Sequence, residues 1–152
     1  MISLVIDSNI FFSAIYNEEG LERKILDISI EKDEIQIFAP DIFWEEVKRV
    51  LIEKLSYTEE EVEQLISKFD IIEIPQNKYE NFKDQAETMI SHKSDAAFVS
   101  ASLFLNCPIW SGNVKHFQHI RNSKEIIWLT SRELLDYLKK RDIISNNLVS
   151  FF

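Results

Sequence analysis

Glycine, proline and cysteine are scarce in this chain of 152 residues, and each shortage excludes a feature. Only two glycines occur, Gly20 and Gly112, so the chain has no glycine-rich phosphate-binding loop of either common type. With three prolines and no low-complexity tract, no linker divides the chain. The single cysteine, Cys107, cannot form an internal disulfide, and we interpret it as a core residue.

Long apolar runs are also missing. No run approaches the roughly 20 residues that a membrane-spanning helix needs. The first run, Ile2 to Ile6, stops at Asp7 and is too short for the apolar core of a signal peptide. The composition is 45% hydrophobic and includes 11 Phe, which is ample material for a core. These features predict a single-domain cytoplasmic protein with no membrane association.

Positive charge is in short supply, since the net charge is −9. That sign argues against nucleic-acid binding, but the charge is unevenly distributed. Residues 1–111 carry 22 acidic and 10 basic side chains, whereas residues 112–152 carry 4 and 7. A metal site built from carboxylates also adds negative charge that its ions later offset. Charge alone therefore leaves the question open.

Short apolar segments alternate with helical patterns along the chain. The expected strands are residues 2–6, 35–38, 71–74, 108–110 and 126–128. The expected helices are residues 8–15, 21–30, 40–55, 58–69, 78–90, 94–105 and 131–141. Pro40 suits the beginning of a helix, and Thr58 with Glu61 forms a capping box. This alternation predicts an α/β fold with three layers, α/β/α, in which helices cover both faces of a mostly parallel sheet.

The domain organisation follows from the same pattern. Residues 1–142 are expected to form one domain, and residues 143–152 an apolar C-terminal tail. The tail is apolar at its very end, so we expect it to pack on the domain or on a partner. The sequence does not distinguish these two arrangements.

Carboxylates stand at positions where a parallel sheet binds ligands, which is beyond the carboxyl ends of its strands. Asp7 directly follows the first expected strand, and Asp95 opens the apolar helix of residues 96–101. Each has a plain structural alternative. Asp7 is a favoured residue for a helix N-cap, and Asp95 in a first turn interacts well with the helix dipole.

Helical geometry selects Glu46 over its neighbour Glu45. At 100° per residue, an apolar arc runs through residues 43, 47, 50, 51 and 55. Glu46 lies at the border of that arc, about 60° from Phe43, whereas Glu45 points away from it. A carboxylate at the border can reach the interior, although Glu46 could also be a flanking surface residue.

Small polar groups follow the expected strand at residues 108–110. Ser111, Gly112 and Asn113 lie where this strand meets the next helix, and their alternative is an ordinary turn. Three carboxylates and one amide at strand ends and inner helix edges make an oxygen-rich site of the kind that hard divalent cations need. With Mg²⁺, such a site suits phosphoryl chemistry.

Four segments, in order, resemble the sequence blocks of the PIN domain family. They are residues 5–11 (Val-Ile-Asp-Ser-Asn-Ile-Phe), 40–47 (Pro-Asp-Ile-Phe-Trp-Glu-Glu-Val), 92–98 (His-Lys-Ser-Asp-Ala-Ala-Phe) and 110–117 (Trp-Ser-Gly-Asn-Val-Lys-His-Phe). Any one block is weak evidence, but their order and spacing make the match strong.

The resemblance implies a ribonuclease that uses Mg²⁺ or Mn²⁺ to cleave RNA, leaving a 5′-phosphate and a 3′-hydroxyl. It assigns metal binding to Asp7, Glu46 and Asp95. Asn9, Ser111 and Asn113 would position water, phosphate or the carboxylates, with Asn113 as the fourth catalytic position. The family includes VapC-type toxins, which are small homodimers held inactive by an antitoxin protein, and this chain's size fits that group.

One departure from the family pattern concerns the last block. Many PIN domains have a fourth Asp there, and the candidates here are Asn113 and His116. A neutral amide would leave the site with a charge of about −3 rather than −4. We therefore predict weaker binding of a second ion, with one-metal catalysis or low activity.

Two alternatives follow. The chain could be a catalytically weak or inactive PIN-fold module that binds RNA or another protein, and Asn113 and the acidic surface favour this reading. His116 and His119, three residues apart, could in principle bind zinc, but no cysteine pair accompanies them. We place His116 instead on a helix surface or near a substrate phosphate.

Overall fold

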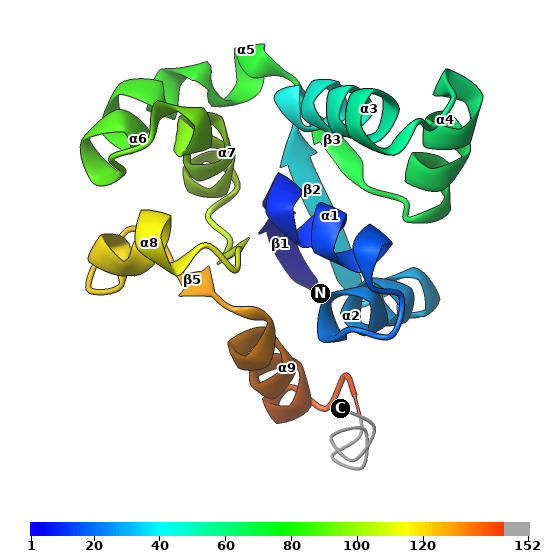
Figure 1. The fold of residues 1–152 in the computed structure, drawn as a ribbon. Helices are drawn as coiled ribbons and strands as arrows, with labels where there is room; N and C mark the ends of the chain where they lie inside the picture. Colours follow the sequence, from blue (N-terminus) through cyan, green and yellow to red (C-terminus); the bar gives the residue numbers. More distant parts are fainter. Residues whose placement is uncertain (145–152) are drawn as a thin grey trace.

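A five-stranded parallel sheet between layers of helices forms the centre of the computed structural model, which describes residues 1–144 (Figure 1). The strands are β1 (Ile2–Ile6), β2 (Ile35–Pro40), β3 (Ile72–Ile74), β4 (Ile109–Trp110) and β5 (Trp128–Leu129). Their order is β3-β2-β1-β4-β5, and every neighbouring pair is parallel. The predicted three-layer α/β/α fold is confirmed.

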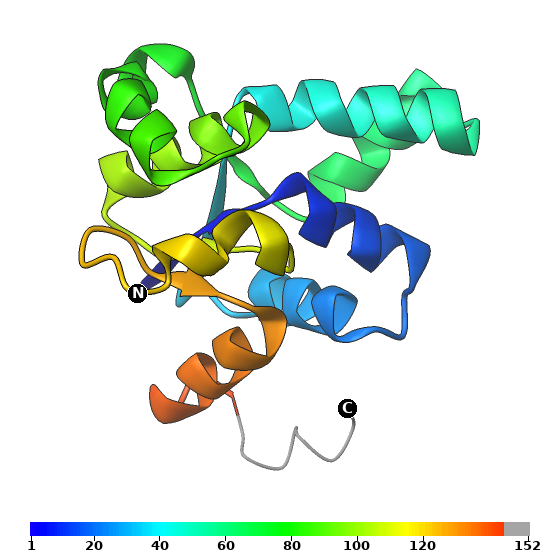
Figure 2. The ribbon, with the colours of Figure 1, turned by 60° about the vertical axis from the view of Figure 1, so that its left-hand side comes forward.

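Helices cover both faces of this sheet. They are α1 (Ser8–Tyr16), α2 (Leu21–Glu31), α3 (Ile42–Leu55), α4 (Glu59–Lys68), α5 (Gln76–Tyr79), α6 (Lys83–Met89), α7 (Ala96–Leu105), α8 (Val114–Phe117) and α9 (Ser131–Lys140). Three short 3-10 helices are η1 (Glu80–Phe82), η2 (Lys93–Asp95) and η3 (Gln118–Ile120). In Figure 1, α1 and α2 lie on one side of the sheet and α6 and α7 on the other. The C-terminal α9 packs beside α2, as Figure 2 also shows.

The order of the strands creates a switch point at β1. The chain adds β2 and β3 on one side of β1 and then returns to add β4 and β5 on the other. Connections on opposite faces diverge at such a point, which leaves a crevice beyond the strand ends where α/β proteins bind ligands. Asp7 and Ser111, which follow β1 and β4, therefore come to the same place.

The apolar core holds α1 firmly over the sheet. Four of the five residues of β1 are buried, as expected for a central parallel strand. Phe11 of α1 packs edge-on against Phe43 and Phe69, with ring centroids 5.4 and 5.7 Å apart. These contacts tie α1 to α3 and to the end of α4. The beginning of α1, next to Asp7, is thereby fixed relative to α3.

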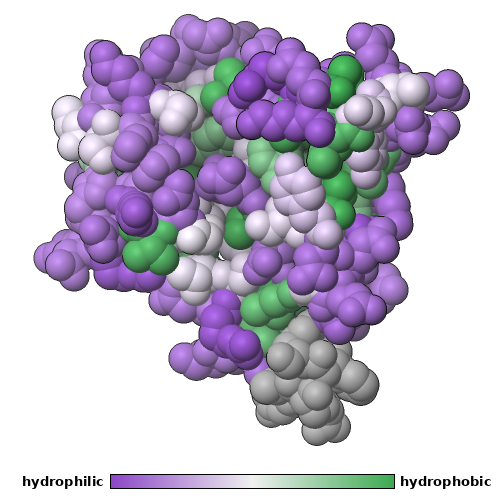
Figure 3. All heavy atoms as spheres, in the orientation of Figure 1, coloured by the Kyte–Doolittle hydropathy of each residue, from purple (hydrophilic) through white to green (hydrophobic). Residues whose placement is uncertain are grey.

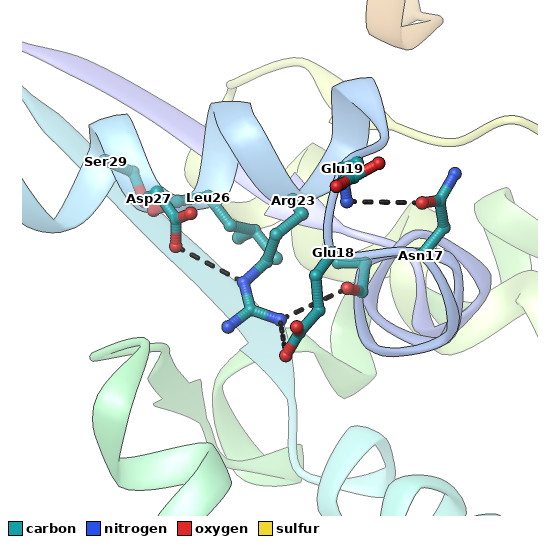
Figure 4. Close-up of polar contacts among 8 residues, drawn as sticks. Asn17, Glu18, Glu19, Arg23, Leu26, Asp27 and Ser29 are labelled. Atoms are coloured by element: carbon teal, nitrogen blue, oxygen red, sulfur yellow. Dashed lines mark hydrogen bonds and ion pairs between the residues drawn. The ribbon is translucent and has the colours of Figure 1, made fainter.

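A buried arginine fastens α2 to its surroundings (Figure 4). Arg23 is 8% exposed, and its guanidinium donates to the Ala14 carbonyl and to the carboxylates of Glu18 and Asp27 at 3.4–3.5 Å. It also lies 5.1 Å from the centre of the Phe69 ring. A buried charge is tolerated when it is paired in this way.

Two tryptophans anchor the loop after β4. The Trp128 indole donates to the Ser111 carbonyl at 2.9 Å, and the Trp110 indole donates to the Ser131 hydroxyl at 3.0 Å. Both tryptophans are buried. Ser111 is thus held from the neighbouring strand β5, which limits its freedom to move away from β1.

The region between β3 and α7 differs from the prediction of one helix over residues 78–90. It contains α5, η1 and α6 instead. The Tyr79 hydroxyl donates to Asp41 at 2.5 Å, which ties α5 to the start of α3, while Phe82 contacts Phe104 of α7. Two separate tertiary attachments require a change of direction, so the helix breaks between them.

Other boundaries also shift. Pro40 is the last residue of β2 rather than the start of a helix, and Asp41 caps α3 by accepting from the Ile42 N–H. The last strand begins at Trp128 instead of Ile126, and α8 with η3 was not predicted. The Thr58 capping box is present as expected.

The predicted tail mostly lies outside the described residues, which end at Ile144. Ile144 itself is buried against the core. None of the helices in residues 1–144 combines the length and apolar character that crossing a bilayer requires. Figure 3 shows a mainly hydrophilic surface in this view, with hydrophobic residues gathered around α1 and α3.

Candidate active site

Asp7 lies at the switch point, directly after β1. It is 4% exposed and occupies the N-cap position of α1, yet its side chain makes no capping hydrogen bond. Instead the Ser111 hydroxyl donates to Asp7 Oδ2 at 2.7 Å. The Asp7 backbone N–H donates to the Trp110 carbonyl, which joins β1 to β4 at this point. The Asn9 backbone N–H also lowers the pKa of the carboxyl, so Asp7 stays close to the start of α1 as well as to Ser111.

Asp95 reaches the same region from the opposite face of the sheet. It is buried, ends η2 and precedes α7, and it makes no side-chain cap either. Its Oδ2 lies 2.6 Å from Nδ1 of His116, and the His116 ring stacks on His92 with centroids 3.6 Å apart. The pairing with His116, and not the helix dipole alone, holds Asp95 in its orientation.

Glu46 approaches from α3. It is half-buried whereas Glu45 is exposed, which confirms the distinction drawn from helical geometry. Burial raises the pKa of the Glu46 carboxyl, and the negative charge of Asp95 raises it further. The Ser8 hydroxyl and the Arg49 guanidinium both act in the opposite direction. Glu46 is thus electrostatically coupled to Asp95 across the crevice.

The pKa of Asp7 is raised to about 6, and the first cause is its burial. The hydrogen bond from Ser111 opposes this shift, while the charges of Asp95 and Glu46 add to it. The pKa of Asp95 is also raised by burial, against the lowering effect of His116 and His92. The charges of Asp95 and Glu46 therefore make Asp7 harder to ionise, and the charge of Asp95 does the same to Glu46.

Ser8, the first residue of α1, lies near Glu46 at the same crevice. Its hydroxyl is buried and has no hydrogen-bond partner, although it is near enough to Glu46 to lower that carboxyl's pKa. The Ser8 hydroxyl thus lies close to the Glu46 carboxyl without a well-formed hydrogen bond to it. A buried polar group without a partner is uncommon, and a bound ligand would satisfy it.

The donor set fits a hard divalent cation, which carboxylate and hydroxyl oxygens bind well. In residues 1–144, however, no three His, Cys, Asp or Glu side chains are close enough to hold a metal ion in the present arrangement. The repulsion that raises the Asp7 pKa and the unpartnered Ser8 hydroxyl are what a cation would relieve. Binding would require the carboxylates to draw together.

Two hydrogen bonds in sequence connect Asn113, Ser111 and Asp7. Ser111 is fully buried, and its hydroxyl accepts from the Asn113 backbone N–H at 3.1 Å while donating to Asp7. Asn113 is half-buried and lines a hollow that also includes the exposed Asn9. Asn9 lines a second hollow with Glu46. The side chains expected to position substrate thus border the carboxylates.

His92 and Ser8 are neighbours of the site that the sequence did not indicate. From the sequence, His116 is a candidate for the fourth position beside Asn113, with a place on a helix surface or near a substrate phosphate. On α8 it turns inward to Asp95, which rules out the plain surface position. Its position three residues after Asn113, in the last block of the resemblance, was the available signal. No zinc-binding group of His, Cys, Asp and Glu exists within the described part of the chain.

The fold and the site define an α/β protein with an acidic crevice at the carboxyl ends of its central strands. A model of the PIN domain family matches residues 5–137. The chain therefore belongs to the PIN domain family.

Solved structures agree on the fold. One is a chain from the structure of VapBC2 of Rickettsia felis, which was solved bound to a DNA fragment from the VapBC2 promoter. Its TM-score is 0.60 at 15% sequence identity, and the match covers 85% of this chain and 98% of that chain. A chain of VapBC-1 from nontypeable Haemophilus influenzae has a TM-score of 0.57 and 17% identity, covering 87% and 99%. A comparison with curated protein sequences finds no significant match.

Proposed function

We propose that the chain is a metal-dependent endoribonuclease that hydrolyses phosphodiester bonds of RNA. PIN domains are generally nucleases, and those nucleases generally use divalent metal ions. The observation that carries the proposal is that three carboxylates, Asp7, Glu46 and Asp95, lie around the switch point of the sheet, each with a raised pKa. A scaffold without a cation gains nothing from that repulsion.

Asp7, Glu46 and Asp95 would hold Mg²⁺ or Mn²⁺, which would supply positive charge to polarise a phosphate and lower the pKa of a water molecule. The hydrogen bond from Ser111 keeps the Asp7 carboxylate in one orientation. His116 does the same for Asp95. Asn9 and Asn113 border the site and carry amides that can donate to phosphate oxygens.

We further propose that the chain acts as the toxin of a toxin–antitoxin pair, as a cytoplasmic homodimer inhibited by an antitoxin protein. The likeness to chains of two VapBC complexes over nearly their whole lengths supports this reading. The predicted apolar tail, residues 143–152, would then contact the domain or a partner. RNA would be the substrate.

The second candidate is a catalytically weak or inactive PIN-fold module that binds RNA or protein. Asn113 favours it, because a neutral amide stands where many PIN domains have a fourth Asp. His116 is already engaged with Asp95 and adds no negative charge to the site. The two candidates differ on turnover, and only the nuclease requires a bound metal ion.

Incubation of the purified protein with a mixed pool of labelled RNAs and Mn²⁺ tests the proposal, with Asp95→Asn as the control. Cleavage by the wild type alone is expected, and the cut sites would begin to define the substrate. Binding of Mn²⁺ without cleavage would favour the inactive module. Neither cleavage nor Mn²⁺ binding would overturn the metal site and the nuclease together.

A further inference from the structure

A groove between α1 and α3 leads away from the acidic crevice. It has a volume of about 530 Å³, within the range of about 300–1,000 Å³ for pockets that hold small ligands, so it has room for a nucleotide. Asn9 and Glu46 line its inner end, and Arg49, Lys54 and Tyr16 line it further along the two helices. The groove is therefore continuous with the proposed active site.

The cations in this groove are available to a ligand. Arg49 and Lys54 are both exposed, and neither takes part in an ion pair with another described residue. Five residues apart on α3, they are separated by about 7.5 Å along the helix axis and about 140° around it, and both line the groove. In a chain of net charge −9, these two cations form a local positive surface beside an acidic centre, although the charge of Arg49 also acts on Glu46.

An aromatic ring completes the groove. Tyr16, at the end of α1, is 59% exposed, and Phe12, one turn earlier on the same helix, is half-buried in the groove. Exposed aromatic rings beside cations are the usual surface for single-stranded nucleic acid, because bases stack on the ring while cations follow the phosphates.

The hollow on the other flank of α1 differs in charge. It shares Asn9 and Ser13 with the groove. Among the described residues that line it, the one charged side chain is the carboxylate of Glu22. A polyanion leaving the crevice would meet attraction on the α3 side and repulsion on the α2 side. This difference in charge favours an RNA strand that leaves the crevice along the α3 side of α1.

We propose that the groove between α1 and α3 binds a single-stranded segment of the RNA substrate, with phosphates on Arg49 and Lys54 and a base on Tyr16. This inference rests on the proposed nuclease function and names the residues of this chain that hold the strand beside the site. A basic protein segment fits the groove less well, because Arg49 and Lys54 would repel it. An apolar segment also fits less well, because it would remove water from these two charges.

Equilibrium binding of a fluorescent single-stranded RNA of roughly 12 nucleotides, in EDTA and over a range of KCl concentrations, tests the proposal without any cleavage. The Arg49→Ala/Lys54→Ala variant should bind roughly tenfold more weakly, and the slope of log affinity against log salt should fall by about 1.4, at about 0.7 per phosphate contact. Tyr16→Ala should lose about five- to a hundredfold, and Tyr16→Phe should retain stacking and restore binding.

The matched control is Lys32→Ala/Lys124→Ala, which removes the same charge. These exposed lysines precede β2 and β5, so they lie toward the amino-terminal ends of the strands, whereas the crevice lies at the carboxyl ends. Equal loss in both double variants would mean that net charge alone matters and would overturn the proposal. Because Arg49 also influences Glu46, Mn²⁺ affinity is measured for each variant, and Lys54→Ala and Tyr16→Ala should leave it unchanged.

The two proposals fail in different ways. A wild type that cleaves RNA, with groove variants that bind RNA as it does, overturns the groove and leaves the nuclease. Groove-dependent binding without cleavage in Mn²⁺ supports the groove and overturns the nuclease. Tighter binding of a duplex of the same sequence than of the single strand would overturn the assignment to single-stranded RNA.

Discussion

Arg23 and Asp7 are both buried charges, but the chain treats them in opposite ways. Arg23 has a carbonyl, two carboxylates and an aromatic face around it (Figure 4). For Asp7, burial raises the pKa first and two further carboxylates add to it, against the lowering effect of the Ser111 hydroxyl and the Asn9 backbone N–H. The first arrangement satisfies a charge and stabilises the fold. The second leaves negative charge uncompensated, which is useful only if a cation binds.

The largest expected effect comes from removing the Asp7 charge in the absence of metal. A folded-state pKa of about 6, against an ordinary value of 3.8, means that the folded protein holds the proton more tightly than the unfolded chain. Stability should therefore fall as pH rises from about 4 to 7, by up to about 3 kcal/mol. Asp7→Asn should remove this loss, so in EDTA it should be more stable than the wild type at pH 7.

Urea denaturation of both proteins in EDTA, across this pH range, measures the effect. The two stabilities should converge below about pH 3, where Asp7 is protonated in the folded and the unfolded states alike. A variant that is less stable than the wild type at pH 7 would mean that Asp7 is satisfied in the fold and would break the contrast with Arg23.

Metal should reverse the order of stability. With Mn²⁺ at about a hundred times its dissociation constant, the wild type should gain about 2.7 kcal/mol, and Asp7→Asn should gain little. Thermal unfolding with and without Mn²⁺ measures this gain. Calorimetric titration should find one tightly bound ion per chain, because Asn113 is neutral. Two tightly bound Mn²⁺ ions would show that the site does not need a fourth carboxylate.

Loss of Arg23 should be the next largest effect. Arg23→Ala removes a buried hydrogen bond to Ala14 and the packing on Phe69, at a cost of about 2 kcal/mol at any pH between 5 and 8. Its carboxylate partners are 75% and 50% exposed, so Glu18→Gln/Asp27→Asn should cost under about 1 kcal/mol. Similar losses in the two variants would show that the ion pairs, rather than the burial, carry the stability.

Ser111→Ala should have the smallest effect of the four. Loss of the hydrogen bond raises the Asp7 pKa further and costs about 1 kcal/mol at neutral pH. The Asn113 N–H also loses its acceptor. NMR titration of the Asp7 carboxyl measures the pKa shift directly, and an unchanged pKa would mean that Ser111 only fills space.

Much of this arrangement can be predicted from local sequence patterns. Alternation of strands and helices predicts the parallel sheet, and strand ends predict that Asp7 and Ser111 meet. The border position of Glu46 follows from helical geometry alone. These features depend on neighbours within one or two elements, where periodicity is informative.

Features that depend on distant contacts could not be predicted. His116 and Asp95 are 21 residues apart, and their pairing depends on the orientation of α8, a helix of four residues. The break between α5 and α6 likewise follows from the separate attachments of Tyr79 and Phe82. Pro40 shows the same limit, because strand pairing with Ile74 decides its position rather than its preference for helix starts.

The fluorescence of the tryptophans that anchor the loop after β4 should report on changes at the crevice. Trp110 and Trp128 are buried beside Ser111, and Arg121 lies 3.9 Å from the centre of the Trp128 ring. The third tryptophan, Trp44, lies on α3. Any movement of the Ser111 segment would change the surroundings of two indoles out of three. Intrinsic emission in a Trp44→Phe background therefore offers an optical record of ligand binding without a label.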